Sequence, residues 1–315
     1  MTSRELVIAA IEHRETERVP YCVQLCGDAW DALKPTTPAQ TLEEFCNNDV
    51  VEIYPPWWTW HDNPTDWYQP DTPASIRSTR GTGNYDAFYD NLKAQREKSD
   101  KYFLAMIYGS HFEKAYFARG FENLMADFAA DPDWTQKLLT RIVDKNMVML
   151  ENILAAPEID GVLLGSDWGS QIDLLMSPRV WEEMIRPGEQ REYDLVHAYG
   201  KHVWVHSCGC IEKVIPSLVE MGLDVLNPLQ PEAMDIAEIK RKHGAKLAFW
   251  GGLSTQQTLP FGTPDELRAE ARRVRDMMSE GGGYIFAPAQ SIQSDVPNAN
   301  IITLFDVARE KRGTK

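Results

Sequence analysis

The feature that most constrains the fold is a regular alternation of short apolar runs with amphipathic stretches in the second half of the chain. Each run ends in small or polar residues, and a stretch with helical spacing follows it. Five runs obey this pattern, at 161–169, 202–209, 224–230, 246–252 and 283–290. Upstream, similar runs lie at 18–27, 49–56 and 101–110, so the sequence predicts eight strands.

Helix-start signals support this alternation. Ser177 is followed by Pro178, and serine is a favoured N-cap while proline is favoured at the first helical position. Thr263 and Glu266 have the spacing of a capping box. A further helix is predicted at 3–14, ahead of the first strand.

Eight strands that alternate with helices are the pattern of a (β/α)8, or TIM, barrel. The 315 residues suffice for one such domain over 1–315, with an N-terminal helical extension. The alternative is a doubly wound open sheet, which normally carries a glycine-rich phosphate loop after its first strand. The segment CVQLCGDAW at 22–30 is not such a loop. We therefore predict an α/β fold of the TIM-barrel type.

Charge and composition exclude some classes of function. The formal net charge of −15 argues against nucleic-acid binding, because phosphates would be repelled. No stretch contains the roughly 18 apolar residues that a membrane span needs. The opening residues lack the features of a signal peptide, and five cysteines without framework spacing suit a reducing compartment. We expect a cytoplasmic protein with no nucleic-acid or membrane partner.

A histidine and a cysteine end the strand predicted at 202–209. Alternation places Trp204, His206 and Cys208 on one face and the intervening valines on the other. The C-terminal ends of TIM-barrel strands form the active-site face, so we expect His206 and Cys208 to face the barrel mouth. An imidazole and a thiolate at this spacing could share a zinc ion. The alternative is a half-buried histidine bonded to backbone, beside ordinary core cysteines.

Other polar side chains follow neighbouring predicted strands. Asp167 ends the strand at 161–169, where it could deliver a proton to a leaving oxygen or orient a substrate. It could equally cap the following helix. The side chains that we expect to contact substrate at this mouth are Trp168, Gln171, Asn227 and Gln290.

The segment YPPWWTWHDNPTDWY at 54–68 holds four tryptophans and two tyrosines. Its three prolines exclude a regular helix or central strand. It could be a structured loop over the barrel. It could also form an aromatic-walled pocket in which Trp57 and Trp58 bind a flat methoxylated ring or a quaternary ammonium group.

Several motifs resemble the uroporphyrinogen decarboxylase superfamily, and together they cover nearly the whole chain. They are RELVIAAIEHRETERVP at 4–20, HSCG at 206–209, LDVLNPLQPEAMDIAEIKRKHG at 223–244, FWGGLSTQQTLPFGTPDEL at 249–267 and GGGYIFAPAQSIQSDVP at 281–297. The resemblance implies a TIM barrel.

The superfamily contains two chemistries. Its decarboxylases make haem precursors without a metal and carry an arginine-rich RQAGRY-type segment after the first strand and an aspartate after the second. This chain has CVQLCGDAW and EIYPPWWTW in those places, without arginines to pair with the carboxylates of a porphyrinogen. The other branch contains methyltransferases that move a methyl group between a small molecule and a cobalt corrinoid on a partner protein.

The resemblance also implies a set of metal ligands. Zinc-bearing methyltransferases of this branch use His-x-Cys on the fifth strand and a cysteine after the eighth. His206 and Cys208 match the pair, whereas Gln290 lies near the position of the third ligand. Cys26, at the end of the neighbouring first strand, could supply the missing sulfur, and Cys210, beyond Gly209, is a poorer candidate.

We therefore predict a corrinoid-dependent methyltransferase, with Asp167 and His206 as catalytic residues and zinc on His206, Cys208 and Cys26. The small molecule could be an aryl methyl ether, and a partner protein would carry the cobalamin. Transfer could also run toward a substrate thiol. Two alternatives stay open: a decarboxylase acting on a non-porphyrin acid, and a non-catalytic binding barrel. A homodimer is compatible with each.

Overall fold

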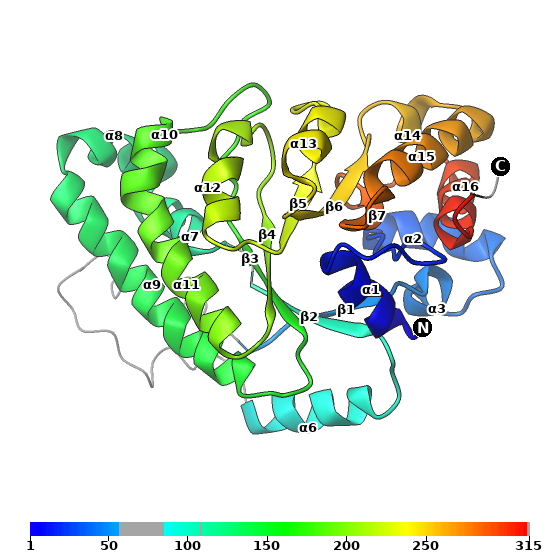
Figure 1. Ribbon diagram of the computed structural model, residues 1–315, viewed down its shortest axis with the longest axis horizontal. Coiled ribbons are helices and arrows are strands. Elements are labelled where there is room, and N and C mark those ends of the chain that lie inside the picture. The colour runs from blue at the N-terminus through cyan, green and yellow to red at the C-terminus, as the bar shows by residue number, and fades with distance from the viewer. Residues whose placement is uncertain (57–84, 108, 314–315) are drawn as a thin grey trace.

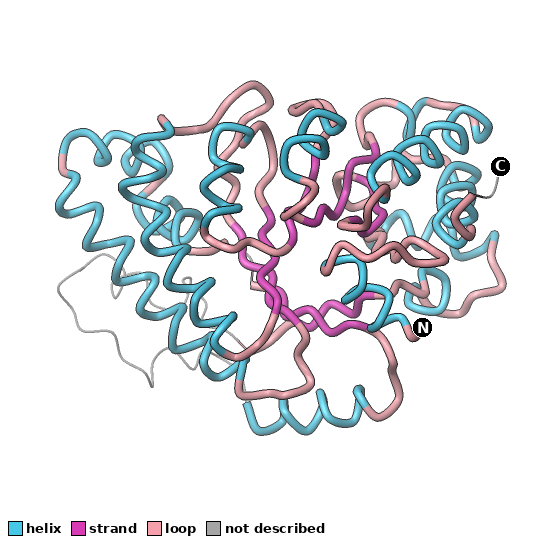
Figure 2. The backbone as a smooth tube through the Cα atoms, viewed as in Figure 1, coloured by secondary structure: helices cyan, strands magenta, loops and turns pink. Residues whose placement is uncertain are grey.

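The centre of the molecule is a parallel sheet of seven strands in chain order. The structure is a computed structural model that describes residues 1–56, 85–107 and 109–313. The strands are β1 (Val50–Ile53), β2 (Tyr102–Met106), β3 (Gly161–Gly165), β4 (His202–His206), β5 (Val225–Leu229), β6 (Ala248–Leu253) and β7 (Tyr284–Pro288). They curl into a half-barrel, with α1 (Ser3–Ile11) packed against its inward-facing side chains and the helices from α6 (Tyr85–Arg96) to α16 (Asn298–Arg309) outside it (Figures 1 and 2). Seven of the eight predicted strands are thereby confirmed.

The helices of the described residues follow the strands as the alternation predicted. They are α1 (Ser3–Ile11), α2 (Gly27–Leu33), α3 (Leu42–Cys46), α6 (Tyr85–Arg96), α7 (His111–Arg119), α8 (Phe121–Ala130), α9 (Pro132–Leu154), α10 (Pro178–Val180), α11 (Arg186–Ala198), α12 (Ile215–Glu220), α13 (Ile236–His243), α14 (Thr258–Phe261), α15 (Pro264–Ser279) and α16 (Asn298–Arg309). A π-helical turn, Trp181–Ile185, joins α10 to α11. None of these helices is long and apolar enough to cross a membrane.

The first predicted strand, at 18–27, is not a regular strand. It forms two isolated parallel bridges, at Tyr21 and Leu25, to residues in and just beyond β7. On its other side, the Asn48 side chain exchanges two hydrogen bonds of 3.0 Å with the backbone of Val23. A side-chain amide thus replaces part of the backbone ladder, so the segment lies between β7 and β1 without forming strand structure.

The predicted alternation along β4 is confirmed. Trp204 faces the inside of the half-barrel, where its ring packs edge-to-face on Trp250 with centroids 5.6 Å apart. Val203 and Val205 belong to the larger apolar cluster under the helices. The strand therefore buries both faces, which is why its sequence is nearly all apolar or aromatic.

The helix-start predictions are confirmed as well. The Ser177 hydroxyl accepts the N–H of Val180, and Thr263 forms a reciprocal capping box with Glu266. The helix predicted at 3–14 ends earlier, at Ile11. All five cysteines are free thiols.

Three aspartates anchor the N-terminal end of the sheet. Asp49, Asp160 and Asp224 immediately precede β1, β3 and β5, and each carboxylate accepts a backbone N–H from the neighbouring segment, at 2.9, 2.8 and 2.7 Å respectively. Asp160 also pairs with Arg4 of α1 at 2.7 Å and Arg96 of α6 at 2.6 Å. One buried carboxylate thereby links the N-terminal helix, α6 and two strands.

The substitution Asp160→Ala tests this anchor. Because two arginines and a buried N–H would lose their acceptor, we expect the free energy of unfolding to fall by about 3–5 kcal/mol. Urea unfolding followed by circular dichroism measures the change, with Glu151→Ala on exposed α9 surface as control, expected to stay within about 0.5 kcal/mol. Equal stability of the two variants would show that Asp160 is not an anchor.

Candidate functional site

Three predicted residues converge at the carboxyl end of the sheet. His206 is the last residue of β4, Cys208 lies two residues beyond it, and Asp167 lies two residues beyond β3. One ligand atom from each of them lies within 4.8 Å of the other two. All three side chains are partly exposed.

The loops after β3 and β4 meet because neither has a side chain at the contact. A Cβ on Gly169 would lie 2.7 Å from the Cys208 carbonyl oxygen, and one on Gly209 would lie 2.5 Å from the Ser170 carbonyl oxygen. Gly209 also has a φ of +81°, which disfavours other residues. The Cys210 N–H donates to the Ser170 carbonyl at 2.7 Å. This contact holds Asp167 beside the end of β4.

Asp167 is bound to the neighbouring loop rather than to a helix start. Its Oδ1 accepts the backbone N–H of Cys208 at 2.7 Å and lies 3.7 Å from Nε2 of His206. Asp167 therefore does not cap the next helix, because the N-cap of α10 is Ser177.

The tautomer of His206 follows from its partners. The Asn227 amide donates through Nδ2 to the Trp250 carbonyl at 3.0 Å, so its Oδ1 is the acceptor for His206 Nδ1–H at 2.6 Å. The lone pair of His206 is then on Nε2, which faces Cys208 Sγ at 3.3 Å. Asn227 thus orients the ring with Nε2 toward the other two side chains.

The Cys208 thiol is held from two sides. Besides His206, the Nε2 of Gln290 contacts its sulfur at 2.9 Å. Burial, and next the negative charge of Asp167, raise the pKa of Cys208 to about 12. A nearby cation is what would make this group a thiolate.

Glu113 belongs to this site, and the sequence reasoning missed it. It lies in the first turn of α7, near Asp167, and the Tyr116 hydroxyl donates to its Oε1 at 3.2 Å. Burial, and then the charge of Asp167, raise the pKa of Glu113. The available signal was an acidic residue shortly after a predicted strand end, at a position where the first turn of a helix follows.

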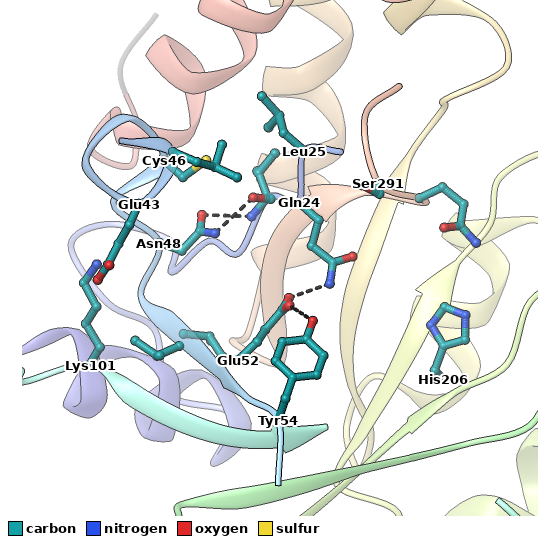
Figure 3. Close-up of a pocket in the computed structure, with 15 residues that line it drawn as sticks. Gln24, Leu25, Glu43, Cys46, Asn48, Glu52, Tyr54, Lys101, His206 and Ser291 are labelled. Carbon is teal, nitrogen blue, oxygen red and sulfur yellow. Dashed lines mark hydrogen bonds between the residues drawn. The ribbon is translucent and has the colours of Figure 1, made fainter. Parts of the chain in front are cut away.

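A cavity of about 690 Å³ adjoins the site, with His206 at one end (Figure 3). Figure 3 places Lys101, Glu43 and Cys46 at the opposite end, with Gln24, Glu52 and Tyr54 between. The Glu52 carboxylate accepts hydrogen bonds from Gln24 and from the Tyr54 hydroxyl. The other described residues that line it include Val23, Leu25, Leu42, Asn48, Val50, Val51, Gln290 and Ser291.

Some predicted site residues lie elsewhere. Trp168 is fully buried against Trp181, with ring centroids 5.4 Å apart, because the alternation that directs Asp167 to the mouth directs its neighbour into the helix layer. Gln171 is exposed on the loop after β3. Trp57 and Trp58 fall outside the residues that the structure describes.

Cys26 does not join the cluster of Asp167, His206 and Cys208. Its thiol contacts the Asp28 carboxylate at 2.6 Å and the Ile292 carbonyl at 2.9 Å. The cause is its position at the N-cap of α2, where the chain has already turned away from the mouth. The third potential ligand beside His206 and Cys208 is Asp167.

This donor set fits a zinc ion. Zinc binds imidazole nitrogen, thiolate sulfur and carboxylate oxygen, and its catalytic sites combine three protein ligands with one open position. Asn227 bonds the ring nitrogen of His206 that faces away from the cluster, and a hydrogen bond of this kind orients a metal-bound imidazole.

Fold and site together indicate a barrel-type α/β protein with a polar centre at the carboxyl ends of β3 and β4. The family model described as uroporphyrinogen decarboxylase (URO-D) matches residues 62–311. The chain belongs to the URO-D family.

Two individual proteins are similar to it. A uroporphyrinogen decarboxylase of Azoarcus sp. (strain BH72) is 27% identical over 158 residues, which are 47% of this chain and 40% of that relative's length. A solved structure described as a methyltransferase from Methanosarcina mazei superimposes with a TM-score of 0.73 over 98% of both chains, at 18% identity. At this identity the likeness shows the fold alone.

The substitution Asn227→Ala tests the orientation of His206. Without the Oδ1 acceptor the ring can rotate, so we expect zinc affinity to fall about 10- to 100-fold. Competition with a chromophoric chelator measures the affinity, and Asn123→Ala on the exposed side of α8 serves as control. An unchanged zinc affinity in Asn227→Ala would refute this role.

The substitution Gly169→Ala tests the contact between the loops. Its methyl group would force the loops apart, so we expect a stability loss of about 1–3 kcal/mol together with weaker zinc binding. Gly27→Ala is the matched control because a Cβ there meets no atom within 4 Å. If Gly169→Ala retained wild-type stability and zinc affinity, the close approach would not hold the site together.

Proposed function

We propose that this chain is a methyltransferase that moves a methyl group between a small molecule and a cobalt corrinoid carried on a partner protein. The substrate class that we favour is an aryl methyl ether. The observation that carries the proposal is the convergence of Asp167 and Cys208 on His206, which lines one end of a large cavity. The fold likeness to a structure described as a methyltransferase supports it.

In this proposal the substrate lies along the cavity with its methoxy group at the His206 end. The Glu52 carboxylate, held by Gln24 and Tyr54, forms a polar wall against which the rest of the molecule is positioned. The methyl group leaves oxygen for cobalt, and the bonding pair stays on the oxygen. What the barrel must stabilise is therefore the negative charge on the departing oxygen.

Two carboxyl groups are placed for proton delivery. Glu113 retains its proton to a higher pH than an ordinary glutamate because it is buried near Asp167. Without zinc, Glu113 could serve as the reservoir from which Asp167, closer to His206, passes a proton to the leaving oxygen. With zinc bound, Asp167 would be a ligand, and the ion would take over the stabilisation of that oxygen.

A zinc ion would be held by His206 Nε2, Cys208 Sγ and an oxygen of Asp167. Bound there, it would supply Lewis-acid stabilisation of the leaving oxygen, or would activate a thiol for the reverse transfer. Asn227 and Gln290 would keep the imidazole and the sulfur in position.

The decarboxylase alternative is favoured by one observation, the 27% identity to a curated uroporphyrinogen decarboxylase. The cavity argues against a porphyrinogen as substrate. Its described lining offers one cation, Lys101, and no arginine, which is poor pairing for several carboxylates. Any decarboxylase activity would act on a smaller acid. The open volume also disfavours a binding barrel with a filled mouth.

The activity is tested by incubating the purified protein with zinc, cob(I)alamin and either methoxylated benzoates or methylamines. We expect conversion to methylcobalamin with an aryl methyl ether. Cys208→Ser should lower the rate by at least about 100-fold, which exceeds the usual loss when a residue that only supports a metal ligand is replaced. Cys210→Ser is the matched control, since this neighbouring thiol lies outside the cluster and should leave the rate within about twofold.

Two outcomes would contradict the proposal. One is the absence of methylcobalamin with every donor class, and the other is equal activity of Cys208→Ser and Cys210→Ser. Release of carbon dioxide from an aromatic acid without corrinoid would favour the decarboxylase alternative.

A further inference from the structure

A second polar cluster lies outside the half-barrel, between α7, α9 and α11, and the proposed function does not use it. His111, Glu189 and Glu192 are fully buried, and one ligand atom from each lies within 4.8 Å of the other two. Glu189 and Glu192 are three residues apart on α11, which places both carboxylates on one helical face. His111 is the first residue of α7.

The imidazole of His111 presents a lone pair to this cluster. Its Nε2 lies 3.1 Å from the Ile185 carbonyl, which can only accept, so the ring proton is on Nε2. The Nδ1 lone pair has one hydroxyl near it, that of Ser110 at 3.3 Å. That hydroxyl donates its single proton to Glu192 at 2.8 Å. Nδ1 is therefore an acceptor without a proton.

Glu192 has partners and Glu189 does not. Glu192 accepts from Ser110 and from Asn146, the latter at 2.7 Å, and Asn146 accepts from Lys114 at 2.7 Å. Neither oxygen of Glu189 accepts a hydrogen bond from any residue that the structure describes. The Nδ1 of His111 lies 3.4 Å from its Oε1. Burial raises the pKa of Glu189, and the hydroxyls of Ser110 and Tyr193 and the charge of Lys114 act to lower it, but none of these groups meets hydrogen-bond geometry with its oxygens.

A buried carboxylate without partners is costly, so a proton or a cation must balance it. A proton on Glu189 would leave both of its oxygens without a good hydrogen bond. The 3.4 Å separation from Nδ1 is too long for a good O–H···N hydrogen bond, and the second oxygen would stay unpaired. A metal ion at roughly 2.0–2.2 Å from each donor would satisfy Nδ1, Glu189 and Glu192 together.

We propose that His111, Glu189 and Glu192 form a buried site for one divalent metal ion of the zinc or manganese type. One imidazole and two carboxylates are a donor set that both ions accept. The hydrogen bond from Nε2 to a backbone carbonyl is the usual way in which the ring of a metal-bound histidine is held in place. A Cβ on Gly188 would lie 2.9 Å from the His111 ring, so this glycine lets α11 approach the ring closely.

The bound ion would tie the start of α7 to α11. The same turn of α7 carries Glu113, the acid beside Asp167. The buried ion is thus a positioning element for one wall of the mouth, and substrate does not contact it. A small cavity of about 50 Å³, lined by His111, Gly188 and Arg191 among others, adjoins the site.

The test uses the full chain with the mouth site removed. His206→Ala/Cys208→Ser protein is incubated with Zn²⁺ or Mn²⁺, freed of loosely bound metal by gel filtration and analysed by mass spectrometry. We expect one tightly held ion per chain, and we expect Glu189→Gln in this background to lose it. Asp194→Asn, on the exposed face of the same helix, is the matched control and should retain it.

A second measurement guards against a Glu189→Gln variant that does not fold. The melting temperature of the His206→Ala/Cys208→Ser protein should fall with a chelator and recover with added Zn²⁺ or Mn²⁺. No bound metal in this protein together with a chelator-insensitive melting temperature would overturn the proposal, as would full retention of metal by Glu189→Gln. These outcomes are independent of methyl transfer, so they leave the proposed function untouched.

Discussion

The candidate site depends on the contact between two loop backbones at Gly169 and Gly209. Neither glycine can be replaced without overlap, because a Cβ on either would lie within 2.7 Å of the facing backbone. The contact joins the loop of Asp167 to the loop of Cys208 through a main-chain hydrogen bond from Cys210 to Ser170 and a hydrogen bond from the Cys208 N–H to the Asp167 carboxylate. Without it, parallel strands alone would bring β3 and β4 side by side but would leave the two side chains free to diverge.

The two ends of the half-barrel have different tasks. At the N-terminal end, buried aspartates accept backbone N–H groups of adjacent segments and pair with arginines from helices, which holds the strands together. At the carboxyl end, Asp167, His206 and Cys208 converge, and His206 lines the cavity. Because the N-terminal end stabilises the sheet, the carboxyl end can contain a buried acid such as Glu113, whose burial raises its pKa. Helix α7 connects the two clusters, since it contributes Glu113 to the mouth and His111 to the buried cluster with Glu189 and Glu192.

Much of this architecture could be predicted from sequence, since periodicity and capping are local properties. Strands β1 to β7 and the inward face of β4 were predicted because each depends on neighbours two residues apart. The segment at 18–27 has strand-like composition, yet the Asn48 side chain takes part of its pairing. Cys26 was predicted to reach the metal, but the start of α2 turns the thiol toward Asp28.

The sequence by itself determined the strand and helix order, the family and the presence of His206 and Cys208 at a strand end, because these follow from patterns within short stretches and from motifs in order. Only the tertiary structure decided that Asp167 is the third potential ligand and that Glu113 lies beside it. The same holds for the meeting of His111 with Glu189, 78 positions further along the sequence. Such juxtapositions depend on how loops and helices pack across the fold, and local spacing contains no information about that packing.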